Sequence, residues 1–195
     1  MGWLIGLLVL AGLAIAWFAG TYNGLVKLRN RFKNAFAQID VQLKRRYELI
    51  PNLVSTVKGY AAHERETLEA VVNARSKATS VQLSPEDLSN QAAMQQLAAA
   101  QGGLTSALSR LMVVVERYPD LKANQNFLDL QNQLEGTENR INVARQRYNA
   151  AVEDFNGSIR RFPQSLTNSL LLKLDRKEYY KADVSAQMAP QVNFN

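Results

Sequence analysis

The sequence contains no cysteine and only one histidine, and these two shortages remove much of the familiar chemistry of protein sites. Disulfides and thiolate metal ligands are excluded, while the redox compartment stays open. His63 is followed four residues later by Thr67, where a zinc-protease helix would need its second imidazole. We therefore predict no catalytic, metal-binding or cofactor-binding residues and no enzymatic activity, and we interpret His63 as a solvated or interface side chain.

Phosphate-binding loops are also missing from the sequence. Gly102 and Gly103 lie inside a helical pattern, without the G-x-x-x-x-G-K-[ST] frame or the preceding strand that such a loop requires. An enzyme is kept as the third hypothesis for function. It would have to use carboxylates, lysine or tyrosine in a helical groove, with His63 as its only proton shuttle near neutral pH.

Charged residues are absent from Gly2 to Gly20, and no strong helix breaker interrupts this stretch. At about 1.5 Å per residue the stretch reaches roughly 28 Å, close to the hydrocarbon thickness of a bilayer. We predict a transmembrane anchor over residues 1–21. The alternative is a cleaved signal peptide, because Ala14–Ala16 resembles a small-residue cleavage site. A signal peptide would normally carry a basic region ahead of its apolar stretch, and Met1 is followed directly by Gly2.

The first charged residues after this anchor are all basic: Lys27, Arg29, Arg31 and Lys33, with no acid before Asp40. Because basic flanks stay in the cytoplasm, we predict that the N-terminus is outside and the rest of the chain is cytoplasmic. Much of the net charge of +6 comes from this group, which also suits anionic lipid headgroups. The lipid bilayer is therefore a predicted partner, and nucleic acid is not.

Small residues recur at every fourth position in two parts of the anchor. Gly2 and Gly6 form one pair, and Gly12, Ala16 and Gly20 form a longer series. Such spacing lets two membrane helices approach closely, so we predict a homo-oligomer that packs through these residues. The alternative is that Gly and Ala are simply common in membrane helices.

After the anchor, apolar residues follow helical spacing almost throughout, which predicts an all-α chain. One stripe consists of Leu25, Leu28, Phe32, Ala35, Ile39 and Leu43, and the next begins at Leu53 and Val57. Pro51 lies between the stripes and disfavours the helical conformation of the residue before it. We predict that the chain reverses near Leu49 to Asn52, because one unbroken helix would leave much of its stripe unpaired.

Two further helices complete a predicted antiparallel four-helix bundle over residues 22–163. Ser84-Pro85 and the acids that follow predict the start of the third helix, and Tyr118-Pro119 predicts its end. The fourth helix is coiled-coil-like and ends at Pro163. Its apolar residues recur at every seventh position: Phe127, Leu134, Ile141, Tyr148, Phe155 and Phe162.

Residues 164–195 form a predicted C-terminal tail that is partly irregular. Within it, Ser165–Leu174 is interpreted as a short amphipathic helix and Ala189–Phe194 as extended or disordered. Because the fourth helix returns toward the anchor, the tail is expected near the lipid surface. Its basic residues would then be available to lipid: Arg160, Arg161, Lys173, Arg176 and Lys177.

Two groups of polar residues lie within the helical pattern. Lys44–Arg46 is interpreted as the basic end of the first helix, where cations interact favourably with the helix dipole. Glu64, Arg75 and Thr137 fall inside the apolar stripes, and we predict that they form a polar layer that fixes the register of the helices.

Segments spread over nearly the whole chain carry a resemblance. They are Tyr22–Val26, Ile39–Val54, Val57–Glu64, Ala74-Arg75, Tyr118–Ala123, Phe127, Ala144-Arg145, Tyr148-Asn149, Phe155-Asn156 and Phe162-Pro163. Together they resemble the bacterial LemA family. The resemblance implies a single-span protein of the bacterial inner membrane with a cytoplasmic helical bundle, and it supplies no activity. Ser169–Leu174 departs from the aromatic and glycine-containing segment that is common there in the family.

These observations predict a non-enzymatic, membrane-anchored helical scaffold. The scaffold would self-associate or present its bundle to an unidentified protein partner. The alternative is an adaptor or sensor that binds a single membrane or cytoplasmic partner.

Overall fold

The computed structural model describes residues 1–181, and every regular element within them is a helix. This confirms the all-α class. The four long helices are α1 (Gly2–Tyr60), α2 (Arg65–Ser80), α3 (Gln91–Val115) and α5 (Gln125–Ser158). The short helices are η1 (Asp87–Ser89), α4 (Pro119–Lys122), α6 (Gln164–Thr167) and η2 (Asn168–Leu172). The expectation for Ala189–Phe194 lies outside the described residues.

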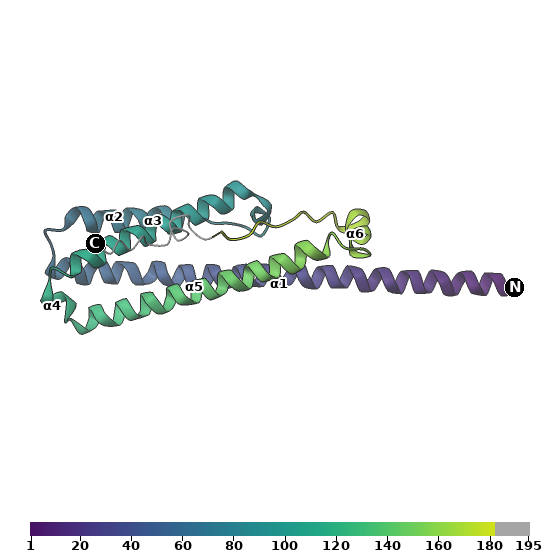
Figure 1. The fold of residues 1–195 in the computed structure, drawn as a ribbon, viewed down its shortest axis with the longest axis horizontal. Helices are drawn as coiled ribbons and strands as arrows, with labels where there is room; N and C mark the ends of the chain where they lie inside the picture. Colours follow the sequence, from purple (N-terminus) through teal and green to yellow (C-terminus); the bar gives the residue numbers. More distant parts are fainter. Residues whose placement is uncertain (182–195) are drawn as a thin grey trace, which may run out of the picture.

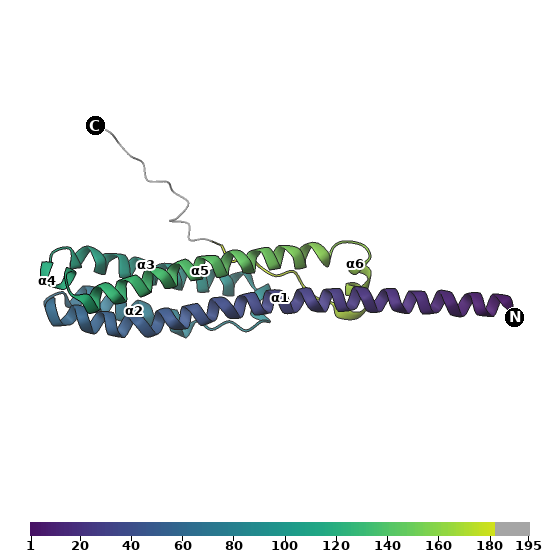
Figure 2. The same ribbon diagram turned by 90° about the horizontal axis from the view of Figure 1, so that it is seen from below.

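Helix α1 is the axis of the molecule (Figure 1). Most of its first third projects beyond the other helices, and Leu25 is the first fully buried residue along it. Helix α5 runs back along the remainder of α1, and α2 packs against α3 on the other side (Figures 1 and 2). Four long helices are present, with lengths from 16 residues in α2 to 59 in α1, but they are not the four that were predicted. The second predicted helix is divided between the end of α1 and α2.

The buried apolar side chains form two clusters along this axis. The cluster nearer the anchor joins α1 to α5, with the rings of Phe32 and Phe155 centred 4.8 Å apart and those of Phe36 and Tyr148 5.6 Å apart. The distal cluster joins the last turns of α1 to α2, α3 and the start of α5. Burial of these stripes is the main apolar contribution to stability.

The seven-residue pattern of α5 is correct for most of its length. Phe127, Ile141, Tyr148 and Phe155 are buried in the two clusters. Phe162 is an exception, because α5 ends at Ser158 and the Phe162 side chain is 76% exposed. The predicted helix end at Pro163 was therefore five residues too late.

The predicted reversal near Pro51 is wrong. Helix α1 continues through Pro51 to Tyr60, and the chain reverses between Ala61 and Glu64. The anchor and the first bundle helix are consequently parts of one helix. The basic group Lys44–Arg46 also does not lie at a helix end, so the dipole interpretation of it fails.

A tertiary hydrogen bond explains why the helix tolerates this proline. Proline has no N–H, so the carbonyl four residues earlier, that of Tyr47, loses its helical donor. Arg75 on α2 supplies a replacement, because its Nε donates to the Tyr47 carbonyl oxygen at 2.8 Å. The Tyr47 carbonyl, which Pro51 leaves without a helical donor, is thus hydrogen-bonded to a residue of α2. Helix α1 can therefore continue through Pro51 without leaving this carbonyl unsatisfied.

The start of the third helix also differs from the prediction. Ser84 donates through both its backbone N–H and its hydroxyl to Asp87, at 2.8 and 2.7 Å, and the chain makes a turn there. Asn90 is the N-cap of α3, accepting hydrogen bonds from the N–H groups of Ala92 and Ala93. Asparagine caps as well as serine does, so the cap type alone did not distinguish the two positions.

The Arg75 bond can be tested with a double-mutant cycle. We expect Arg75→Met to lower the free energy of unfolding by about 1–3 kcal/mol, because it leaves the Tyr47 carbonyl without a donor. In a Pro51→Ala background residue 51 has its own N–H, and the same substitution should cost clearly less. Chemical denaturation of the full-length protein in detergent, followed by circular dichroism, measures both values.

Lys77→Met, an exposed change on the same helix, is the control and should be near neutral. Equal costs of Arg75→Met in the two backgrounds would show that the bond does not compensate for the proline.

Candidate functional site

The apolar part of α1 carries the predicted packing residues on an uncovered surface. Its membrane-length window is entirely exposed in this single chain. A side chain built at Gly2, Gly6, Gly12 or Gly20 would meet no atom within 4 Å. Ala16 is likewise exposed. These positions are therefore open to a neighbour. Helix α3 is also apolar and long enough to span a membrane, but it is partly buried in the bundle, so core packing explains its composition.

The basic flank divides into two halves in the structure. Arg31 forms an ion pair with Asp154 of α5 at 2.7 Å, and Lys33 lies 3.9 Å from Glu86. Lys27 and Arg29 have no ion-pair partner among residues 1–181 and lie nearer the apolar segment. Of the four predicted residues, Lys27 and Arg29 are therefore the two whose charge is not paired with a carboxylate of the bundle.

A buried arginine separates the two apolar clusters. The Arg46 side chain is only 5% exposed and lies 3.1 Å from a carboxylate oxygen of Glu138 on α5. It also donates to the Thr105 hydroxyl on α3 at 2.9 Å. Burial lowers the pKa of the Arg46 guanidinium, and the Glu138 charge opposes that shift. One arginine from α1 thus links α3 and α5.

Tyr47 extends this polar layer, which we define as Arg46, Tyr47, Gln101, Thr105 and Glu138. Its hydroxyl donates to the Ala78 carbonyl oxygen of α2 at 3.2 Å and accepts a bond from the Gln101 amide of α3. Burial raises the pKa of the Tyr47 phenol. The predicted polar layer of Glu64, Arg75 and Thr137 does not form as such, because these three residues bond elsewhere.

Each of those three has a separate role. Arg75 binds the Tyr47 carbonyl, as described above. Glu64 lies at the distal end of the bundle, where Tyr118 donates to it at 3.1 Å and Arg117 lies 3.0 Å from the same oxygen. Thr137 is fully buried and donates to the Gln133 carbonyl within α5 at 2.7 Å.

The segment after η2 is tied along the bundle by asparagines. We call residues 174–181 the strap. Asn156 accepts from the Lys177 N–H at 2.9 Å and donates to the Lys177 carbonyl at 2.8 Å. Asn149, two turns earlier on α5, makes the same pair of bonds with Tyr180, at 2.8 and 3.0 Å. The Lys177 ammonium group also donates to the Ser89 hydroxyl, so this side chain is held at the bundle and does not face the lipid as expected.

Catalytic chemistry has no evident centre in the part of the chain that the structure describes. His63 is exposed in the turn between α1 and α2, so it is a solvated residue as predicted. Residues 1–181 contain no group of three or more histidine, aspartate and glutamate side chains arranged to hold a metal ion. The polar layer is built of hydrogen-bonded structural partners and lacks a nucleophile paired with a base.

A family model described as the LemA family matches residues 35–194. The chain belongs to the LemA family. Among its relatives, Protein LemA of Metamycoplasma hominis is 28% identical over 127 residues, which cover 64% of this chain and 52% of that protein. The magnetosome proteins MamQ 1 and MamQ 2 of Paramagnetospirillum magneticum are each 27% identical over 159 residues, covering 71% of this chain and 58% of theirs. The chain spans about half the length of the curated relatives it matches.

This assignment confirms the resemblance. The N-terminal apolar helix indicates a membrane anchor, so the chain is membrane-associated. Neither the family description nor the names of these relatives denote an enzyme. Sequence reasoning missed the roles of Arg46, Asn149 and Asn156. For the two asparagines the spacing could have revealed a shared role, since Asn149 and Asn156 are seven residues apart and each follows a buried aromatic residue.

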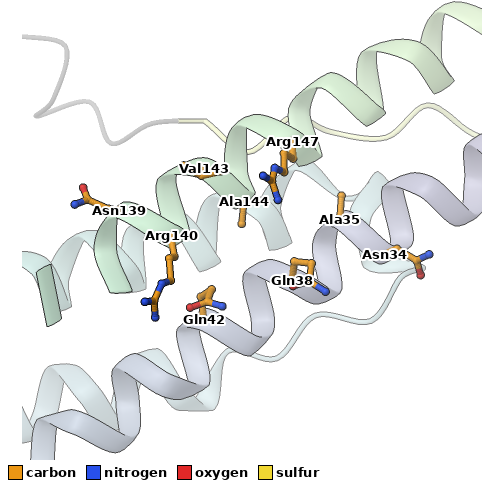
Figure 3. A pocket seen from close by; sticks show the side chains of 9 residues that line it. All are labelled: Asn34, Ala35, Gln38, Gln42, Asn139, Arg140, Val143, Ala144 and Arg147. Carbon is orange, nitrogen blue, oxygen red and sulfur yellow. The ribbon is translucent and has the colours of Figure 1, made fainter. Parts of the chain in front are cut away.

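One outer groove of the LemA bundle runs between α1 and α5 (Figure 3). Ala35 and Ala144 lie where the two helices face each other, while amide and arginine side chains border the groove. Val143, which is 45% exposed, adds an apolar side chain. Arg140 and Arg147 give the groove a positive character.

Within the polar layer, we predict that replacing Glu138 lowers the free energy of unfolding more than replacing Arg46 does. Glu138→Gln leaves Arg46 buried without a counter-charge, and we expect it to lower the free energy of unfolding by about 2–3 kcal/mol. The Glu138 side chain is 35% exposed, so water can solvate it when Arg46 is replaced. Arg46→Met should therefore cost less than Glu138→Gln, and the combination should recover part of the loss. Denaturation in detergent measures all three variants.

Glu153→Gln, at an exposed position of the same helix, is the matched control. If Glu138→Gln proves as mild as this control, Arg46 does not depend on its carboxylate partner.

Proposed function

We propose that this LemA protein is a membrane-anchored, non-enzymatic helical scaffold that self-associates or presents its bundle to protein partners. One observation carries the proposal: no residue in the membrane-length window of α1 is buried, and the helix continues without interruption into the packed bundle. Leucine, isoleucine and valine side chains each gain about 1.5–3 kcal/mol on leaving water, so this segment requires an apolar environment. A bilayer supplies one of the matching thickness.

The continuity of α1 determines how such a scaffold would hold its bundle. The 59 residues of the helix correspond to about 88 Å, of which roughly 58 Å lies beyond the anchor. A flexible linker would let the bundle tumble, whereas one helix fixes its direction relative to the membrane. The bundle would therefore project from the membrane and present its sides to neighbours.

The orientation that we propose places the N-terminus outside and the bundle in the cytoplasm of a bacterium, beneath its inner membrane. Support comes from the basic residues that follow the span, because lysine and arginine beside a span favour the cytoplasmic side. The three relatives described above are from two bacteria. All four basic residues, Lys27, Arg29, Arg31 and Lys33, lie close enough to the span to count toward this bias.

Single-cysteine labelling tests the anchor and its orientation, because the native chain has no cysteine. We expect Gly2→Cys to react with a membrane-impermeant maleimide on intact cells. Val113→Cys, which replaces a 71% exposed side chain of α3, should react only after the membrane is permeabilised. The reverse labelling pattern would place the bundle outside. Recovery of the protein from the soluble fraction would contradict the anchor itself.

Self-association is tested by enlarging the small residues of the span. If Gly12, Ala16 and Gly20 form the contact, Gly12→Ile with Ala16→Ile should weaken association at least about tenfold, or roughly 1.4 kcal/mol. Ala11→Ile with Ala14→Ile adds similar volume on the opposite side of the helix and should leave association unchanged. Energy transfer between labelled copies in lipid vesicles measures both.

Equal association of the two double variants would move the contact to the bundle surface. A parent protein that stays monomeric in vesicles would contradict self-association. The second candidate function, an adaptor for one partner, would then be favoured, and the basic groove between α1 and α5 is the observation that supports it.

A further inference from the structure

A turn beyond α5 exposes several large apolar side chains close together in the sequence. We call residues 162–172 the interfacial turn; it contains α6 and η2. Its Phe162 is 76% exposed, Leu166 40%, and Leu170 and Leu171 60% each. Four such side chains within 10 positions form a local apolar surface, which is costly in water unless something covers it.

The interfacial turn lies against α1 where the apolar segment ends. The hydroxyls of Thr21 and Thr167 are 2.7 Å apart, and the rings of Trp17 and Phe162 are centred 6.0 Å apart. Figures 1 and 2 both show α6 beside α1 at this level, at the end of the bundle nearest the N-terminus. The exposed side chains of the turn are thus continuous with the exposed surface of the anchor.

Hydrogen bonds fix the shape of this turn. Asn168 accepts from the Leu174 N–H at 2.8 Å and donates to the Leu174 carbonyl at 3.1 Å. Lys173 between them adopts a left-handed conformation with φ of 47°, which sends the chain back toward the bundle. The apolar residues are therefore presented by a closed turn whose exit is held by the strap.

We propose that the interfacial turn inserts into the boundary between headgroups and acyl chains, as a second contact with the bilayer that α1 spans. This proposal rests on the anchor proposed above. Trp17 is an aromatic residue of the kind that favours this boundary, and Phe162 lies beside it. The depth of Phe162 is thereby set by its contact with the span.

Charge complementarity supports lipid as the occupant of this surface. Between residues 159 and 174 the chain has three basic side chains, Arg160, Arg161 and Lys173, and no acid. All three are exposed, and none has an ion-pair partner among the described residues. Basic residues around an apolar surface match a membrane with anionic lipids, at which each contributes to binding.

Fluorescence at single cysteines provides the test, using the full-length protein in vesicles of phosphatidylcholine and phosphatidylglycerol. An environment-sensitive dye is attached at Leu170→Cys or, separately, at Leu171→Cys. Val113→Cys is the bundle control and Leu8→Cys the span control, and both replace side chains that are 71% exposed in the single chain. Circular dichroism confirms that each variant keeps its helical content.

We expect the labels at 170 and 171 to emit at shorter wavelength than the label at 113. Lipids with a nitroxide near the headgroup should quench them at least twofold more strongly than the label at 113. The label at position 8 should be quenched by lipids with a nitroxide deep in the acyl chain.

Two results would overturn the proposal while leaving the anchor in place. One is water-like emission without lipid quenching at 170 and 171, with normal quenching at 8. The other is apolar emission at 170 and 171 without lipid quenching, which would mean that a second copy covers the turn. Loss of quenching at position 8 would instead show that the anchor itself has failed.

Discussion

The rest of the structure depends on the continuation of α1 through Pro51, where Arg75 donates a hydrogen bond to the carbonyl of Tyr47. Pro51 removes the donor that this carbonyl would use in a regular helix, and its ring crowds the same oxygen. Because α2 supplies the replacement, α1 extends to Tyr60 and the chain reverses beyond it. The length of the bundle, the site of the turn and the direct attachment of the bundle to the anchor all follow from the continuity of α1 through Pro51.

The continuous helix also determines which polar groups enter the core. Once α1 passes Pro51 without reversal, Arg46 lies between Leu43 and Ile50 on its buried face. A buried charge in that position requires polar partners, and Glu138 on α5 and Thr105 on α3 provide them. The polar layer separates two apolar clusters that would otherwise merge, so sliding of one helix against another would leave Arg46 unpaired. It therefore specifies register, although replacing such a pair by apolar residues need not destabilise a fold.

Much of this fold was predictable from spacing alone, since the apolar stripes of α1 and α5 are buried as their periodicity requires. The path of the chain at Pro51 was not predictable in this way, because the carbonyl of Tyr47 is satisfied by Arg75, which lies 28 positions after Tyr47. The position of Arg46 within an apolar stripe also indicated its burial, but it was not used in predicting the path of the chain. Ile39, Leu43, Arg46, Ile50, Leu53 and Val57 follow steps of four and three without a break. That unbroken stripe indicated one helix with a buried arginine, against the local preference of proline.

The same continuity accounts for where the chain returns. Helix α5 begins beside the distal turn and is 34 residues long, so its antiparallel course along α1 brings its end back toward the start of the packed region. The apolar turn that follows reaches Thr21, the level at which α1 becomes exposed. Had α1 reversed at Pro51, the distal turn would lie nearly three helical turns closer to the anchor, and an α5 of this length would extend well past Thr21. The continuation of α1 to Tyr60 therefore puts the distal turn at the distance from which an α5 of this length brings the following turn back to the level of Thr21.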